Sequence, residues 1–173
     1  MRLILRAAAR MHAVGAGSNA KPPQKAARKF LRSLPIPPGW TTDHWELLAW
    51  TVRYHRGAEP RSDRGAFSRL SEEQQAGVCA LAGLLRLARA LRKFSMQSGS
   101  GLRAEKFPDA FLVRVPGLPD SVEAATRLAA AKHLLESFLC KPLILKPYVL
   151  PQNVVALPPQ PQQHIELSAA ASD

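Results

Sequence analysis

One long helix, predicted from Ser71 to about Ser95, constrains the fold of this chain most strongly. Ser71 and Gln74 have the spacing of a capping box, in which each side chain satisfies the other residue's backbone amide at the start of a helix. Apolar residues then recur at the three- and four-residue intervals that place them on one helical face. This apolar arc contains Val78, Leu81, Leu84, Leu85, Ala88 and Leu91.

Three shorter helices are predicted before it. Residues 1–14 place Arg2, Arg6 and Arg10 on one helical face, because arginines four residues apart are neighbours on a helix surface. A helix over Pro23–Leu34 has proline in its first turn, where no amide partner is lost. A third helix begins with a capping-box pair, Asp43 and Glu46, and ends at Gly57.

A different pattern follows the loop at residues 97–101. Alternating side chains in residues 102–117 predict a β-hairpin. A helix of about 20 residues starts at Asp120 and Glu123, and residues 142–149 form a last strand. On that helix, the side chains expected to face the core of the domain are Val122, Leu128, Leu135 and Phe138. Helices followed by hairpin, helix and strand predict a mostly α (α+β) domain.

Composition limits the class of protein. Hydrophobic residues make up 46% of the 173 residues, which is enough for a packed core, and no run of about 18 apolar residues could span a bilayer. Cys79 and Cys140 have no metal-ligand spacing and cannot form a disulfide framework. We expect a cytoplasmic protein without membrane contact. An acid-free, arginine-rich start is also typical of a mitochondrial transit peptide, and that alternative stays open.

The charge is uneven. The chain has 24 Lys and Arg residues, 13 Asp and Glu residues and a formal net charge of +11. Residues 1–56 contain ten of the cations and two acids, Asp43 and Glu46. A surplus of this kind indicates a polyanion or an acidic partner without identifying it.

Basic side chains cluster in the sequence RYHRGAEPRSDRG, after the third helix. Arg53, His55, Arg56, Arg61 and Arg64 lie there, and a second basic stripe at Arg86, Arg89 and Lys93 runs along the long helix. Cations at a helix C-terminus complement the helix dipole, which is the structural interpretation. The functional interpretation is an anion site, because the guanidinium fork suits phosphate oxygens.

No catalytic or metal motif accompanies these residues. The histidines His12, His44, His55, His133 and His164 form no close metal-binding pair, and the chain has no Gly-rich phosphate loop and no nucleophile elbow. His133, in the middle of a helix, is interpreted as a core or boundary histidine. We therefore predict no catalytic residues, no metal and no cofactor.

Several ordered segments resemble the C-terminal helical domain of the exopolyphosphatase and guanosine pentaphosphatase (Ppx/GppA) family. These are WELLAWTVRYHRGAEPRS, then FSRLSEEQQAGVCALAGLLRLARAL, with LILRAAARMHAVG before them and the PLILKP strand after. The resemblance implies an HD-domain-like helical bundle over residues 1–147. Residues 148–173, rich in Pro, Gln and Ala, are predicted to form a disordered tail.

The departures from the family pattern bear on chemistry. His12 is followed by Ala13 where an HD site has aspartate, and Arg89 and Arg92 occupy the positions where the last acid is expected. A guanidinium there would repel a divalent metal, so a metal-dependent hydrolase is not expected. The family's catalytic, actin-like region is expected to lie upstream of these residues, so we predict no catalysis by this chain on its own.

The resulting hypothesis is an accessory domain of Ppx/GppA type. It binds polyphosphate or another polyanion, or docks on a separate Ppx/GppA catalytic protein, with the anion contacts assigned to Arg53, His55, Arg56, Arg86, Arg89 and Lys93. A basic nucleic-acid-binding protein and a non-functional fragment of an exopolyphosphatase are the alternatives. A homodimer stays open.

Overall fold

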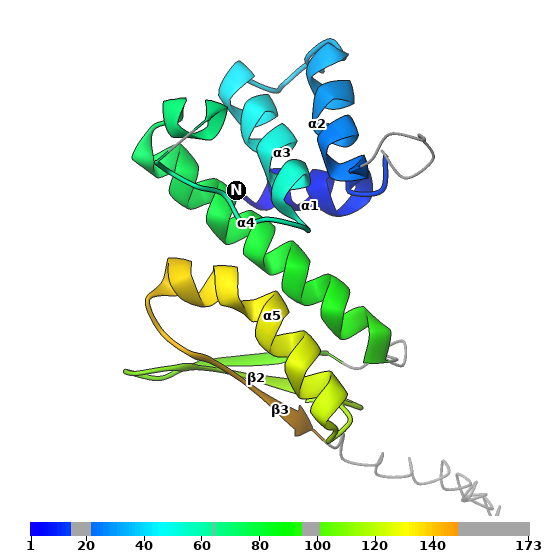
Figure 1. The fold of residues 1–173 in the computed structure, drawn as a ribbon, viewed down its shortest axis with the longest axis vertical. Coiled ribbons are helices and arrows are strands. Elements are labelled where there is room, and N and C mark those ends of the chain that lie inside the picture. The colour runs from blue at the N-terminus through cyan, green and yellow to red at the C-terminus, as the bar shows by residue number, and fades with distance from the viewer. Residues whose placement is uncertain (15–21, 64, 95–100, 149–173) are drawn as a thin grey trace, which may run out of the picture.

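Helix α4 (Glu72–Leu91) is the central element of the fold, and the rest of the structure packs around its two halves (Figure 1). The computed structural model describes residues 1–14, 22–63, 65–94 and 101–148. Before α4 come α1 (Arg2–Met11), α2 (Pro23–Ser33), α3 (Thr42–Tyr54) and the short 3₁₀ helix η1 (Ala66–Arg69). After it come η2 (Arg92–Phe94), β1 (Arg103–Lys106), β2 (Phe111–Pro116), α5 (Val122–Leu139) and β3 (Leu143–Tyr148).

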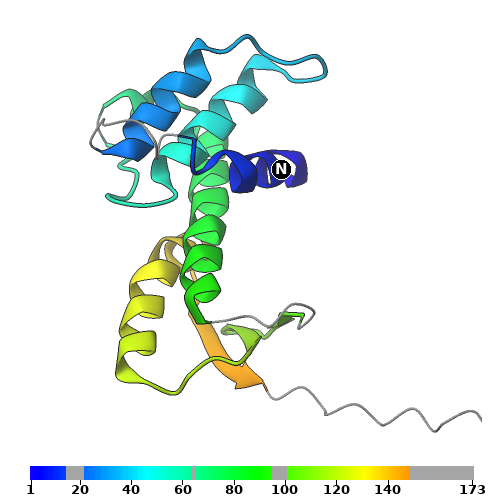
Figure 2. The same cartoon turned by 90° about the vertical axis from the view of Figure 1, so that its right-hand side faces the viewer.

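Helices α1 and α3 pack on the first half of α4, and α2 packs on α3 (Figure 2). Leu48 and Val52 of α3 and Val78 of α4 are fully buried in this first core. The indole Nε1 of Trp45 donates a hydrogen bond of 2.9 Å to the carbonyl of Leu31, which joins α3 to α2. These contacts bury the apolar faces that the short helices could not cover alone.

The second half of α4 packs on α5 and a three-stranded sheet. The sheet order is β1-β2-β3, with β1 antiparallel and β3 parallel to β2. Helix α5 is the crossover that a parallel pair requires. Leu87 and Leu91 of α4 meet Val115, Leu128 and Leu143 in a second core. The predicted mostly helical α+β fold is therefore confirmed, with the hairpin, helix and strand in the expected order.

The capping box of α4 is confirmed, but its predicted apolar arc is partly wrong. The Ser71 hydroxyl accepts from the Gln74 amide at 3.2 Å, and the Gln74 side chain accepts from the Ser71 amide at 3.1 Å. Leu84 is 40% exposed and Ala88 is also exposed, whereas Leu87 is buried. The arc assumed one buried face, but α4 is buried on two sides, by α3 and by α5.

Two further expectations about helices are wrong. Asp43 does not cap α3; the Thr41 hydroxyl accepts from the His44 amide at 3.2 Å, so the helix begins earlier. Glu46 is drawn instead into ion pairs with two α2 arginines, at 3.0 Å from Arg28 and 3.3 Å from Arg32. Charge-assisted hydrogen bonds to two guanidinium groups are stronger than a single bond to a backbone amide, so the Glu46 carboxylate points toward α2 rather than toward the start of α3.

Helix α5 also differs from its predicted orientation. Its N-cap is Ser121 rather than Asp120, because the Ser121 hydroxyl accepts from the Ala124 amide. Leu128 and Leu135 face the core as expected, but Val122 is 84% exposed and Phe138 is 41% exposed. Val122 lies on the same face of α5 as Ala125, Thr126 and Ala129, which are also exposed, so it is turned away from the core.

Some expectations fall outside the described part of the chain. They concern the break after the first helix, the loop beyond residue 94, and the predicted disordered tail, of which only Tyr148 is described, at the end of β3. Within the described residues, no helix is long and apolar enough to cross a membrane.

Candidate anion-binding groove

Five of the six predicted anion-binding residues lie around one open groove of about 310 Å³. The end of α3 contributes to one wall, α4 forms the floor, and α5 forms the other wall. The lining side chains are His55, Arg56, Arg86, Arg89, Lys93 and Arg127, with Ala90, Ala130 and Ala131 between them. No carboxylate is among these lining residues. The sequence left open whether the basic residues after α3 lie beside the basic stripe of α4, and the structure brings them together.

Arg86 holds the end of α3 in place. Its Nε donates to the carbonyl of Tyr54 at 2.8 Å, and its Nη2 donates to the carbonyls of Gly57 and Ala58 at 2.9 and 3.1 Å. Its Nη1 lies 3.8 Å from a carboxylate oxygen of Glu59. The last carbonyls of a helix have no partner within that helix, and Arg86 supplies one from outside. Its donors are therefore directed at the protein rather than at the groove.

His55 is a neutral, buried member of the groove wall. It is 1% exposed, and its Nδ1–H donates to the carbonyl of Val52 at 2.6 Å, which leaves Nε2 as the acceptor. Burial lowers the pKa of His55 to about 4, and the positive charges of Arg89 and Arg56 act in the same direction. At neutral pH, His55 can accept a hydrogen bond but adds no charge to the groove.

Arg56, Arg89 and Lys93 supply uncompensated positive charge. None of them has an ion-pair partner among the described residues, and Arg56 Nε is buried without a hydrogen-bond partner there. Burial lowers the pKa of Arg89, and the charges of Arg56 and Arg92 lower it further. The guanidinium groups stay charged at neutral pH. An anion in the groove would relieve both the repulsion and the missing hydrogen bond.

Arg53 is the predicted residue that the groove does not include. Its guanidinium lies over the Tyr54 ring, 5.0 Å from the centroid, and burial lowers its pKa. Of the other arginines in the basic segment, Arg61 pairs with Asp63 at 3.3 Å, and Arg64 is outside the described residues.

Arg127 is the groove residue that sequence analysis missed. Its Nη2 lies 2.7 Å from Glu123, so the predicted i, i+4 pair on the solvent side of α5 is confirmed. The same arginine also faces the groove, because α5 runs antiparallel to α4 alongside it (Figure 1). A pairing within one helix is readable from spacing, but the neighbour of that helix is not.

The residues where an HD site would hold its metal form no ligand cluster. His12 and His55 come together, with ring centroids 5.5 Å apart, although 43 positions separate them. In the described residues, no three His, Cys, Asp or Glu side chains are placed to hold a metal ion. His133 is exposed rather than in the core, and its Nδ1 lies 3.1 Å from a Glu59 carboxylate oxygen.

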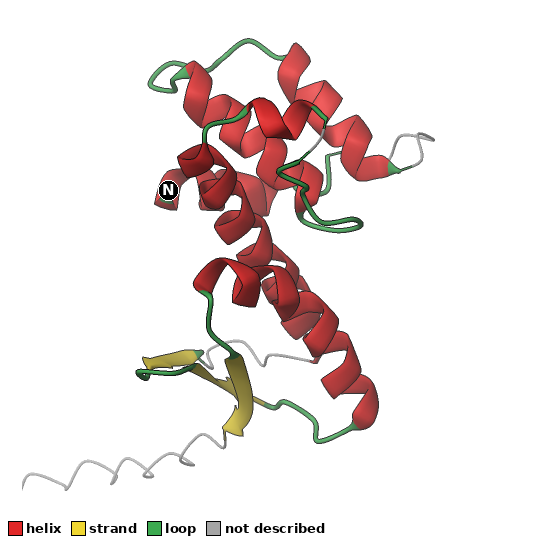
Figure 3. Ribbon diagram, turned by 60° about the vertical axis from the view of Figure 1, so that its left-hand side comes forward, coloured by secondary structure: helices red, strands yellow, loops and turns green. Residues whose placement is uncertain are grey.

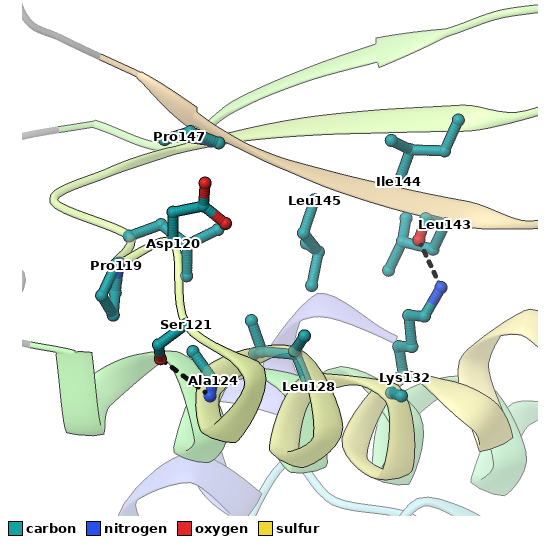
Figure 4. A pocket seen from close by; sticks show the side chains of 13 residues that line it. Pro119, Asp120, Ser121, Ala124, Leu128, Lys132, Leu143, Ile144, Leu145 and Pro147 are labelled. Carbon is teal, nitrogen blue, oxygen red and sulfur yellow. Dashed lines mark hydrogen bonds between the residues drawn. The ribbon is translucent and has the colours of Figure 1, made fainter.

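A second hollow, between α5 and β3, differs in chemistry. This cleft of about 340 Å³ is mostly apolar, with Leu128 and Leu145 facing each other across it (Figure 4). Its one cation, Lys132, is already bonded to Glu136 and to the carbonyl of Leu143, at 2.8 and 2.9 Å. The cleft therefore has no free charge to offer an anion.

Comparison with known proteins identifies the family. The model of "Ppx/GppA phosphatase, domain III" matches residues 1–107, which contain α1 to α4 and β1. A comparison with curated proteins gave no significant match. The family match ends inside the β-hairpin, so Arg127 and the rest of α5 lie beyond it. Because the match covers more than half of its length, this chain belongs to the Ppx/GppA phosphatase family and contains that family's domain III.

Proposed function

We propose that this chain is a non-catalytic accessory domain that binds polyphosphate, or a similar phosphate-rich chain, in the groove between α3, α4 and α5. The observation that carries the proposal is the convergence of Arg56, Arg89, Lys93 and Arg127 around one groove without a lining carboxylate. Charge-assisted hydrogen bonds from such groups to phosphate oxygens are among the strongest that side chains make.

The rest of the lining favours a chain of phosphates over a nucleotide. Its one ring, His55, is buried in the wall, so no aromatic face is available for a base to stack on. Ala90 in the floor and Ala130 and Ala131 in the α5 wall have short side chains, which lets a ligand approach the backbone of α4 and α5. An open groove with distributed cations fits a linear, repeating anion.

The test is fluorescence anisotropy of labelled polyphosphate titrated with the protein at near-physiological salt. We expect binding that an equal concentration of phosphate groups in RNA fails to displace. Arg89→Glu should weaken binding by about tenfold or more, because it removes one charged contact and adds a repulsion. Arg6→Glu, on the exposed face of α1, makes the same change in net charge away from the groove.

The outcomes separate the candidates. Equal weakening by Arg89→Glu and Arg6→Glu would show that the net charge, not the groove, attracts the chain. Displacement by RNA at equal phosphate concentration would favour the nucleic-acid alternative. Absence of binding would overturn the proposal. Phosphate release that survives chelation of metals and co-purifies with the protein would show that the domain is catalytic.

A further inference from the structure

The outer face of the sheet, which is turned away from α5, carries a row of three cations. The strand register pairs Arg103 with Arg114, and Arg114 with Lys146, so one cation from each strand lies in the same row. Figure 4 shows Leu145 pointing toward α5 and Ile144 pointing to the opposite side of β3. Lys146 is two residues from Ile144 and so shares the outer face.

Two of the three cations in this row have no ion-pair partner among the described residues. Arg114 Nε pairs with Glu105 at 2.8 Å, but Arg103 and Lys146 have no carboxylate partner in the described part of the chain. Like charges directly opposite each other destabilise a sheet. Arg103 and Lys146 lie on the edge strands β1 and β3, where cations also hinder edge-to-edge pairing of sheets.

Apolar side chains flank the cations on both sides. The register places Leu112 beside Ile144 in one neighbouring row, and Pro116 beside Tyr148 in the other. Leu112 and Pro116 are buried, so the accessible apolar surface comes from β3. Ile144 is 42% exposed. All described helices lie on the other side of the sheet, so none of them covers this surface (Figure 3).

We propose that this face docks an acidic amphipathic helix of a partner protein. Neighbouring strands are about 4.8 Å apart, and the Cβ atoms of helical residues i and i+4 are about 5–6 Å apart. A helix lying across the strands with acids at i, i+4 and i+8 therefore presents one carboxylate to each strand. Apolar residues beside those acids would contact Ile144, which is exposed.

Other occupants fit this face less well. A single nucleic-acid strand needs free aromatic rings for its bases, but the guanidinium of Arg103 covers the Tyr148 ring at 4.9 Å from the centroid. Addition of a strand to the β3 edge is hindered by Pro147, which has no amide hydrogen. A chain of phosphates would leave Ile144 uncovered.

The experiment uses the full chain and a labelled model helix. The probe is a 20-residue peptide with Glu at i, i+4 and i+8 and Leu beside each Glu; its control has the same composition in scrambled order. We expect the scrambled peptide to bind about fivefold more weakly or worse. The Arg103→Glu, Lys146→Glu double variant should lower affinity by about tenfold. Lys25→Glu, Lys29→Glu on α2 makes the same change in charge and should leave affinity unchanged.

Several results would overturn the proposal. These are equal affinity for the two peptides, equal loss in both double variants, displacement of the peptide by a 12-nucleotide RNA at the same concentration, and no binding. If circular dichroism shows that the charge reversal unfolds the sheet, Arg103→Gln, Lys146→Gln replaces it, with an expected loss of about threefold. Polyphosphate binding in the groove is measured separately, and its outcome does not affect this test.

Discussion

Arg86 and Arg89 lie one turn apart on α4 and have the same chemistry, but their surroundings give them different roles. Arg86 is 11% exposed at its side chain and donates to the last carbonyl of α3 and to two carbonyls of the loop that follows. Arg89 has no such partners and faces the groove. The sequence predicted that the two would lie side by side, but not which carbonyls would be within reach of Arg86.

Glu123 competes with any anion for Arg127. The carboxylate lies 2.7 Å from the Arg127 guanidinium and is itself 80% exposed at its side chain. We expect Glu123→Gln to strengthen polyphosphate binding about two- to threefold, since the guanidinium is released toward the groove. Glu72→Gln, in the first turn of α4, removes the same charge from a comparable helix position and should change affinity little. Equal gains in both variants would assign the effect to net charge.

His55 makes stability depend on pH. An unfolded histidine titrates near 6.5, whereas burial lowers the pKa of His55 to about 4 in the folded protein. Between these values the unfolded chain binds a proton that the native state does not, so the free energy of unfolding falls as the pH decreases. The full loss is on the order of 3 kcal/mol and is reached near pH 4. Above pH 6.5 both states are neutral and the effect is absent.

Urea unfolding between pH 7 and pH 4.5 measures this dependence. His55→Gln should flatten the decrease, whatever its stability at pH 7, because the buried titrating group is gone. His44→Gln changes an exposed histidine, and the decrease in the free energy of unfolding with falling pH should be the same as in the wild type. An unchanged slope in the His55 variant would assign the acid sensitivity to other groups.

The contact between α4 and α5 depends on Gly83. A Cβ at this position would lie 3.0 Å from the backbone N and Cα of Leu135, which cannot move without shifting α5. We expect Gly83→Ala to lower the free energy of unfolding by about 1–3 kcal/mol, although alanine is the better helix former. At Gly77 the nearest atom is the flexible end of Met1, at 2.8 Å, so Gly77→Ala should cost less or stabilise.

Thermal melting of the two alanine variants checks this difference. A smaller loss for Gly83→Ala than for Gly77→Ala would contradict the packing described for α4 and α5.

Local signals predicted the elements better than their surroundings. The Ser71 capping box, the proline at the start of α2 and the alternation in the hairpin each depend on neighbours in sequence, and each is confirmed. The exposure of Leu84 and the role of Glu46 depend on elements far away in the chain. Periodicity shows which residues share a face, but it does not show how many faces a helix buries.

The same limit applies to the groove. Basic residues at the end of α3 and on α4 were grouped from the sequence, and the structure places most of them together. Arg127 was not grouped with them because its partner within α5, Glu123, already explained its charge. Arg53 was included by proximity in sequence, although its guanidinium lies against Tyr54.

The two cores of the molecule are joined through α4. Leu48 is fully buried in the first core and Leu91 is 2% exposed in the second, and α4 supplies residues to both. All three tryptophans, Trp40, Trp45 and Trp50, belong to the first core. Tryptophan fluorescence therefore reports on one end of the molecule only.

We expect Leu91→Ala to lower the free energy of unfolding by about 2–5 kcal/mol. Because α4 couples the cores, the melting temperature from tryptophan fluorescence should fall as much as that from far-ultraviolet circular dichroism. Leu48→Ala, which is adjacent to the tryptophans, is the comparison for a direct effect. A fluorescence transition unchanged by Leu91→Ala would show that the two cores unfold independently.

The family match and the folding unit have different limits. A polypeptide cut after residue 107 would keep every matched position. It would also lack α5, which packs on the C-terminal half of α4, and Leu87 and Leu91 would be exposed to water. One wall of the groove would go with it, because Arg127 belongs to the discarded part. Such a fragment would be prone to aggregate and would lose a contact to its anion, so the boundary useful for expression lies after β3, at residue 148 or later.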